Sequence, residues 1–164
     1  MKKFCLVFLA LLLLAFAGCD SHQTVKIDNG VQTTDLSDIE IDGLKIGTPI
    51  ANADLTRYTK ADISYSKYTY DYQEIRIAVN GYGLITGLQG TAGIIPFSLN
   101  GHISPTKISE TIDILGKNHN NYWFDSEQKI KANTYIDKEH HISLTIAYST
   151  MDNGLVWAIL SSIS

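Results

Sequence analysis

Alternation of apolar and polar residues is the feature of this sequence that most limits its fold. Isoleucine or valine fills every second position of residues 74–80 ("EIRIAVN"), and residues 141–148 ("HISLTIAY") repeat the alternation. Because successive side chains of a strand point to opposite faces of a sheet, the pattern predicts strands with one buried face. The segments "NGYG" at 80–83 and "MDNG" at 151–154 each contain an Asn-Gly pair, which favours tight hairpin turns. We therefore expect an antiparallel sheet.

The same order of signals occurs twice, which predicts two diverged repeats, at about 41–90 and about 97–164. "IDG" at 41–43 is matched by "LNG" at 99–101, and each is followed by a hydroxyl residue and a proline. A hydroxyl residue at the N-cap with proline at N1 is typical of a helix start. Apolar residues with i, i+4, i+7 spacing then predict a short amphipathic helix in each copy: Ala51, Leu55 and Tyr58 in the first, Ile108, Ile112 and Leu115 in the second.

Strands are expected after each predicted helix. They cover residues 64–72, 74–80 and 83–89 in the first copy, and 121–125, 129–136, 141–148 and 154–160 in the second. The predicted fold class is α+β: two diverged strand–helix–β-meander repeats form an antiparallel sheet packed on short helices. A chain of this length can bury roughly 70% of its extended surface, so we expect residues 41–164 to form a single domain.

This order of elements resembles the tandem architecture of the β-lactamase-inhibitor-protein-like fold. The segment "IDILGK" at 112–117, followed by aromatic strands, is also similar to small bacterial lipoproteins of the barrel-assembly type. The inhibitor's disulfides have no counterpart here, so a β-lactamase target is unsupported. Members of this fold mostly bind other proteins, and the resemblance implies the same for this chain.

The N-terminus predicts a lipoprotein signal peptide at residues 1–18. Lys2 and Lys3 precede an apolar run of about a dozen residues, which is too short to span a bilayer comfortably but suits a secretory signal. The run ends in "FAGC" at 16–19, which resembles a bacterial lipobox and implies diacylation of Cys19. The alternatives are an ordinary signal peptide with a coincidental cysteine, or an uncleaved anchor. Acyl chains would hold the protein on a membrane, and Asp20 resembles an inner-membrane retention signal.

Residues 19–40 are polar without a sustained period, and we interpret them as a tether. The predicted location is therefore the outer face of the cytoplasmic membrane, with the lipid as the membrane contact. The whole chain carries a charge of −4, and removal of Lys2 and Lys3 leaves −6. This acidic balance argues against binding of nucleic acid. After cleavage no thiol remains free, which excludes disulfides, cysteine zinc sites and a cysteine nucleophile.

The sequence contains no recognised catalytic motif. A nucleophile elbow, a P-loop, a dinucleotide-binding glycine motif and a His-Glu-x-x-His metal motif are all missing. His119, His140 and His141 are the only residues that suggest a metal, and neighbours in a strand point to opposite faces. We therefore predict no metal, no cofactor and no enzyme, although a hydrolase without a recognisable motif stays open.

Aromatic residues crowd matching places in the two copies. Tyr68, Tyr70 and Tyr72 would share one strand face, and Tyr122 and Trp123 occupy the corresponding segment of the second copy. If this face pointed outward it would resemble a protein-binding surface, where Tyr and Trp are enriched. If it pointed inward it would be covered by its own helix. The leading hypothesis is a module that binds an envelope protein, and the alternative is a carbohydrate or wall-polymer module. The oligomeric state is left open.

Overall fold

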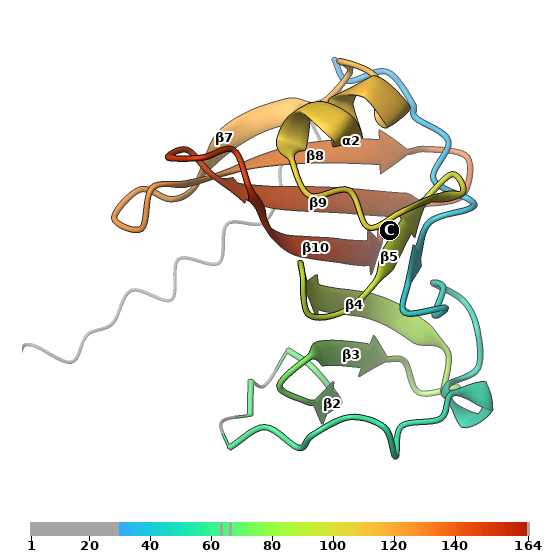
Figure 1. Ribbon diagram of the computed structural model, residues 1–164. Coiled ribbons are helices and arrows are strands. Elements are labelled where there is room, and N and C mark those ends of the chain that lie inside the picture. Colours follow the sequence, from blue (N-terminus) through green and yellow to red (C-terminus); the bar gives the residue numbers. More distant parts are fainter. Residues whose placement is uncertain (1–29, 63, 66, 164) are drawn as a thin grey trace, which may run out of the picture.

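The computed structural model describes residues 30–62, 64–65 and 67–163. They form two antiparallel sheets with one α-helix and one short 3₁₀ helix (Figure 1). The larger sheet has the strand order β2-β3-β4-β10-β9-β8-β7, and the smaller one has the order β1-β5-β6. The bounds are β1 (Glu40–Ile41), η1 (Ile50–Asn52), β2 (Tyr70–Asp71), β3 (Ile75–Val79), β4 (Ile85–Thr91), β5 (Phe97–Leu99), β6 (His102–Ile103), α2 (Ile108–Leu115), β7 (Asn120–Asp125), β8 (Ile130–Asp137), β9 (Ile142–Ser149) and β10 (Leu155–Ser162).

The larger sheet joins two meanders. Strands β2 to β4 follow one another along the chain, as do β7 to β10, and the last strands of the two meanders pair antiparallel. In that pairing Trp157 lies opposite Thr91, and Ser161 lies opposite Gly87. The expected antiparallel sheet is confirmed, and the turns at 80–84 and 150–154 connect neighbouring strands as the Asn-Gly pairs indicate.

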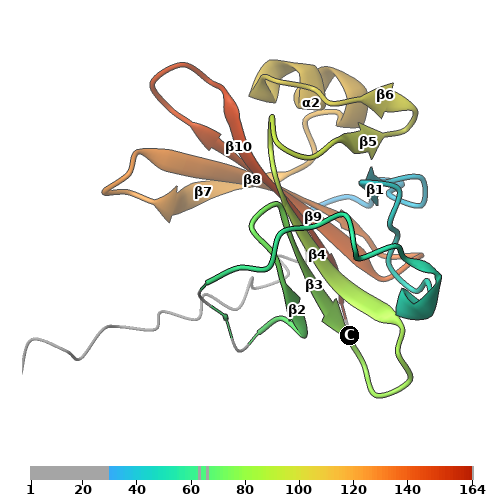
Figure 2. The ribbon, with the colours of Figure 1, turned by 60° about the horizontal axis from the view of Figure 1, so that its bottom comes forward.

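The core lies on one face of the larger sheet, called here the front face. Helix α2 and the smaller sheet lie over this face, as Figure 2 shows. Ile77, Leu88 and Leu144 of the larger sheet are buried in one cluster with Ile41 and Phe97 of the smaller sheet. The two layers lie close together at Gly90, where a Cβ atom would lie 2.7 Å from a methyl of Ile95, just before β5, and 2.8 Å from a methyl of Ile41 in β1.

Helix α2 forms where the second copy predicts a helix, but it begins later than Ser104-Pro105. Lys107 is the N-cap, and the carboxylate of Glu110 accepts hydrogen bonds from the backbone N–H of Thr106 (2.7 Å) and Lys107 (3.4 Å). This carboxylate satisfies N–H groups that a helix start leaves without partners. Gly116, with a φ of 85°, ends the helix.

The helix predicted around Ala51, Leu55 and Tyr58 is wrong. Only η1 forms there, and Ala53 is already extended. Backbone contacts with the β3–β4 hairpin explain the difference, because Pro49 bridges to Leu84 and the N–H of Ile50 donates to the carbonyl of Gly83 (2.9 Å). Extended pairing at its start therefore keeps a helix from beginning at Thr48-Pro49.

Part of the predicted 19–40 tether packs against the domain. The N–H of Thr34 donates to the carbonyl of Ile136 (2.8 Å), and Leu36 and Ile39 are buried in the core. Cys19 and the rest of the predicted signal and tether, residues 1–29, lie outside the described residues.

Candidate functional site

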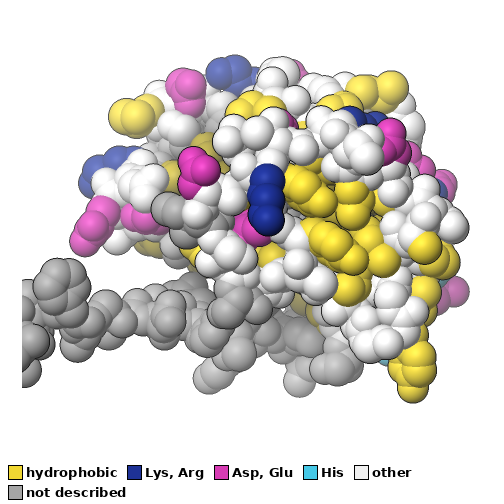
Figure 3. Space-filling view, turned by 90° about the horizontal axis from the view of Figure 1, so that it is seen from below, with side chains coloured by type: hydrophobic (Ala, Val, Ile, Leu, Met, Phe, Trp, Pro, Cys, Tyr) yellow, Lys and Arg dark blue, Asp and Glu magenta, His cyan; other side chains and the backbone are white. Residues whose placement is uncertain are grey.

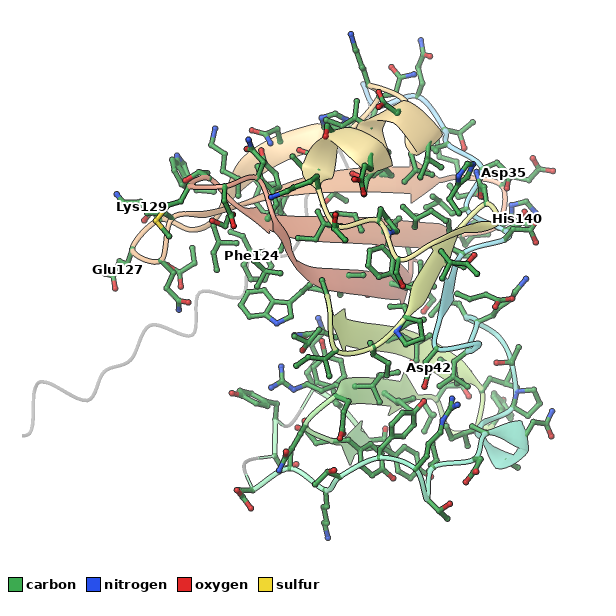
Figure 4. The ribbon with its side chains drawn as sticks, viewed as in Figure 1. Asp35, Asp42, Phe124, Glu127, Lys129 and His140 are labelled. Atoms are coloured by element: carbon green, nitrogen blue, oxygen red, sulfur yellow. The ribbon has the colours of Figure 1, made fainter. Side chains whose placement is uncertain are left out.

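Exposed aromatic side chains gather at edge strand β7. Trp123 and Phe124 of β7 are 46% and 41% exposed, and the Phe124 ring lies 5.6 Å from the ring of Trp157 on β10. Figure 4 shows Phe124 near the β7–β8 turn that carries Glu127 and Lys129. We call Trp123, Phe124 and Trp157 the aromatic ridge.

A bulge in β7 gives the ridge its shape. The register between β7 and β8 shifts between Trp123 and Asp125, so two residues of β7 lie opposite one residue of β8. Trp123 lies opposite Lys131, whose ammonium nitrogen is 5.0 Å from the indole ring. Phe124 instead turns towards Trp157, on the face opposite the core, called here the back face. The ridge therefore presents aromatic rings on both sides of one edge strand.

The middle of the back face is closed by its own polar contacts. The hydroxyl of Tyr122 lies 3.3 Å from that of Thr134, which lies 2.8 Å from that of Thr145. Thr134 and Thr145 are buried, as are the neighbouring Ala132 and Ala147. Because these hydroxyls satisfy one another, a partner would find its free aromatic contacts at the ridge rather than in the middle of this face.

Tyr68 does not share a face with Tyr70 and Tyr72, so the prediction that all three lie on one face is wrong. Tyr70 pairs with Ile77, and the Tyr72 ring lies 5.4 Å from the ring of Tyr58; both tyrosines are half-buried beside the core. The Tyr68 hydroxyl donates to the Gln89 side chain (2.7 Å), and burial raises the pKa of Tyr68.

The physical reason is that β2 contains only two residues. A turn precedes it, closed by a 2.9 Å hydrogen bond from the N–H of Tyr68 to the carbonyl of Tyr65, and the turn breaks the alternation between Tyr68 and Tyr70. Figure 3 looks from below, towards the end of the molecule where β2 lies in Figure 1, and shows hydrophobic side chains gathered there. Tyr70 and Tyr72 contribute to packing at this end of the core.

An ion-paired aromatic contact lies near the far edge of the back face. The Arg76 guanidinium carbon is 4.3 Å from the centre of the Tyr65 ring, and Arg76 Nε donates to Asp71 (3.0 Å). The backbone N–H of Tyr65 also donates to Asp71. Asp71 therefore holds both Tyr65 and Arg76 in place. The exposed ring of Tyr65 lies apart from the aromatic ridge.

Asp137 and His140 form a polar group with Asp35 at the β8–β9 turn, labelled in part in Figure 4. One ligand atom from each of the three residues lies within 4.8 Å of the others. Asp137 accepts hydrogen bonds from the N–H of Leu36 (2.8 Å), the N–H of His140 (2.9 Å) and the His140 ring (2.8 Å). These contacts make the group a clamp that fastens the N-terminal segment to the sheet.

The pKa directions agree with this clamp. Burial alone would raise the pKa of Asp137, but the hydrogen bonds from Leu36 and His140 outweigh it and the pKa is lowered. The hydrogen bond to Asp137 raises the pKa of His140. The other predicted histidines are elsewhere: His119 packs against Tyr135 with ring centres 5.1 Å apart, and His141 has a left-handed backbone in the turn.

A shallow depression of about 170 Å³ lies on the outer side of the smaller sheet. Its two carboxylates already have partners: Glu40 lies 3.3 Å from Lys45, and Asp42 lies 2.8 Å from Arg57. Asp42 also accepts from the Tyr58 hydroxyl (2.7 Å). Burial, and then the hydrogen bond to Asp42, raises the pKa of Tyr58 to about 12. These contacts hold Asp42 against Arg57 and Tyr58.

Sequence reasoning found Trp123 but did not single out Trp157. The available signal was alternation in the last strand, where Ala158 and Leu160 face the core and Trp157 therefore faces the back.

Comparison with family models, with curated proteins and with solved structures found no match. In the described part of the chain, no helix is long and apolar enough to cross a membrane.

Proposed function

We propose that this protein is a lipid-anchored extracytoplasmic module that binds a protein partner in the cell envelope. The anchoring half of the proposal rests on the sequence around Cys19. A short apolar run that ends in "FAGC" suits acylation at that cysteine. Two acyl chains hold a protein on a membrane where one does not, so the domain itself needs no membrane-binding surface.

The aromatic ridge is the observation that carries the binding half. Two large aromatic side chains, Trp123 and Phe124, stay more than two-fifths exposed beside the half-buried Trp157. Tryptophan at the centre of an interface commonly contributes about 2 kcal/mol or more to binding. Lys131, stacked on Trp123, adds a cation at the same place.

The shape of the ridge favours a protein over a carbohydrate. Sugar rings stack on flat, accessible aromatic faces, whereas the planes of Phe124 and Trp157 are tilted by 44° against each other. A protein interface suits such an angular surface because aliphatic and aromatic side chains can fill it from several directions.

The proposed repeat has support in two matching turns. Asp42 and Gly43 have φ angles of 52° and 76°, and Asn100 and Gly101 have φ angles of 49° and 82°. Both pairs follow strands that lie side by side, because β1 pairs with β5. Two left-handed residues in succession are typical of a type I′ turn. We therefore infer that the two copies share one ancestral unit, although only the second kept an α-helix.

Affinity capture from membranes tests the binding proposal. The tagged, lipidated protein is compared with the double variant Trp123→Ala/Phe124→Ala, and with Tyr82→Ala as a matched control. Tyr82 is 91% exposed but lies in the β3–β4 turn, away from the ridge. We expect the double variant to lose captured protein and Tyr82→Ala to keep it. The ridge would be rejected as a protein-binding site if all three proteins captured equal amounts of protein. It would also be rejected if the wild-type protein bound purified wall polymer as well as it binds captured protein.

A further inference from the structure

Strand β7 has a backbone edge whose groups point away from the sheet. In an antiparallel ladder the N–H and C=O of one residue point to the same side, and successive residues alternate. The carbonyl of Ile136 accepts from Thr34 on the β7 side of β8, whereas the carbonyl of Lys129 accepts from Thr150 on the β9 side. The backbone N–H and C=O groups of the even-numbered residues of β8 therefore point towards β7.

The alternation in β8 determines which backbone groups of β7 point away from the sheet. Tyr122 lies opposite Ala132, so the backbone of Tyr122 points towards β8. Its neighbours Asn121 and Trp123 then direct their N–H and C=O groups outward. No described residue accepts or donates a backbone hydrogen bond there.

The other edges in the described part of the chain are short or covered. Strand β2 has two residues, and residues 59–61 bond to its outer side: the N–H of Ala61 donates to Asp71, and the N–H of Gln73 donates to Thr59. Strand β6 also has two residues. Natural sheets usually protect an edge with charge, proline or shortness, but β7 has six residues with neither lysine nor proline. Its bulge comes only after Trp123.

We propose that the occupant of this edge is a second copy of the same chain, paired antiparallel through β7. A two-fold axis through Tyr122 places Asn121 of each copy opposite Trp123 of the other. The backbone groups of these two residues point at one another, so the two copies form two hydrogen-bonded residue pairs. Tyr122 meets its own counterpart on the back face, where facing aromatic side chains stabilise strand pairing.

Charge also permits this register. The only charged residue of β7, Asp125, lies beyond the bulge, so no like charges face each other between Asn120 and Phe124. Thr34 lies beside Ile136 of β8, beyond the end of β7, so among the described residues it does not cover the outer edge between Asn121 and Trp123. A two-fold pair is the commonest form of self-association.

The inference rests on the proposed function, because the two-fold axis would bring two aromatic ridges together into one composite binding surface. Lipid anchoring favours the pair as well, since tethering both copies to one membrane raises their effective concentration. A single pair of short strands buries less surface than a standard interface, so we expect the pair on membranes rather than in dilute solution.

Disulfide cross-linking in membranes tests the register. Residues that face each other without bonded backbones have Cα atoms about 4.5 Å apart, which suits a disulfide. In the full lipidated protein, Tyr122→Cys should give a covalent dimer on oxidation. Tyr82→Cys, whose side chain is more exposed, should not. A third variant, Tyr122→Cys/Trp123→Lys, places a cation in the ladder and should cross-link much less.

Amide hydrogen exchange on the full chain in micelles is the second readout. The amides of Asn121 and Trp123 should gain protection as protein concentration rises, while that of Tyr122 is already protected by β8. Equal cross-linking at positions 82 and 122, or unchanged exchange at Asn121 and Trp123, would overturn the pairing. If pairing fails while Trp123→Ala/Phe124→Ala still loses its captured protein, the proposed function stands and the inference alone is wrong.

Discussion

Replacement of Gly90 tests how the smaller sheet lies on the larger one. Gly90 of β4 lies opposite Ala158 and Ile75, and its φ is outside the left-handed region, so an L-residue meets no backbone obstacle. A Cβ atom would lie 2.7 Å from Ile95 and 2.8 Å from Ile41, closer than carbon atoms can approach. Gly90→Ala must therefore push the two layers apart.

The expected loss follows from two opposing effects. Overpacking a core costs about 1–3 kcal/mol, while removing a glycine from a strand recovers about 0.5–1 kcal/mol of chain entropy. The middle of each range leaves a net loss in the free energy of unfolding of about 1 kcal/mol. For a domain of this size that corresponds to a Tm lower by roughly 2–8 °C.

Thermal melts of Gly90→Ala and Gly87→Ala make the comparison. Gly87 lies in the same strand, but the nearest atom to its added Cβ would be the Cβ of Ala78 at 3.3 Å. We expect Gly87→Ala to change Tm little. Ile95→Ala should reduce the cost of Gly90→Ala in a double-mutant cycle, because it removes one clashing methyl. Equal Tm values for the two glycine variants, without coupling to Ile95, would refute the packing described here.

Three further predictions concern the clamp, a tyrosine and the anchor. The lowered pKa of Asp137 means that its stabilisation is lost as pH falls below about 3.8, and the raised pKa of His140 means that its stabilisation is lost as pH rises above about 6.5. Protection of the Leu36 amide, corrected for the pH dependence of intrinsic exchange, should thus be highest between these values, and His140→Gln should remove only the alkaline change. Tyr72→Ala should lower the free energy of unfolding by roughly 1.5–2.5 kcal/mol in denaturant melts, about half the cost of truncating a fully buried aromatic residue; an unchanged midpoint would show that its ring is not part of the core. Cys19→Ala should abolish incorporation of labelled palmitate and membrane retention, and an unlabelled wild-type protein would show that no lipid is attached.

Local signals predicted most of the larger sheet. Alternation around Ile75–Val79 and Ile142–Ser149 places strands correctly, and Asn-Gly pairs mark two of its turns, because both signals depend on neighbouring residues alone. Helix α2 was also predictable from its apolar stripe, although Ile112 is only half-buried while Ile108 and Leu115 are buried.

Tertiary pairing decided the features that sequence reasoning missed. Apolar spacing suggested a helix around Leu55, but pairing of Pro49 with Leu84 keeps the start of that segment extended. Alternation suggested one tyrosine face, but the turn before Tyr70 interrupts the strand. The aromatic ridge depends on the bulge after Trp123 and on β10 lying across the sheet from β7, and neither is encoded in neighbouring residues.

Photo-cross-linking from the ridge in cells tests the central claim most directly. A photoreactive phenylalanine analogue replaces Phe124 in the lipidated protein, and in a matched variant it replaces Tyr82. We predict a discrete protein adduct from position 124, either with a second copy or with an envelope partner, and none from position 82. Equal adducts from both positions, or none from position 124, would contradict the account of β7 as a protein-binding edge.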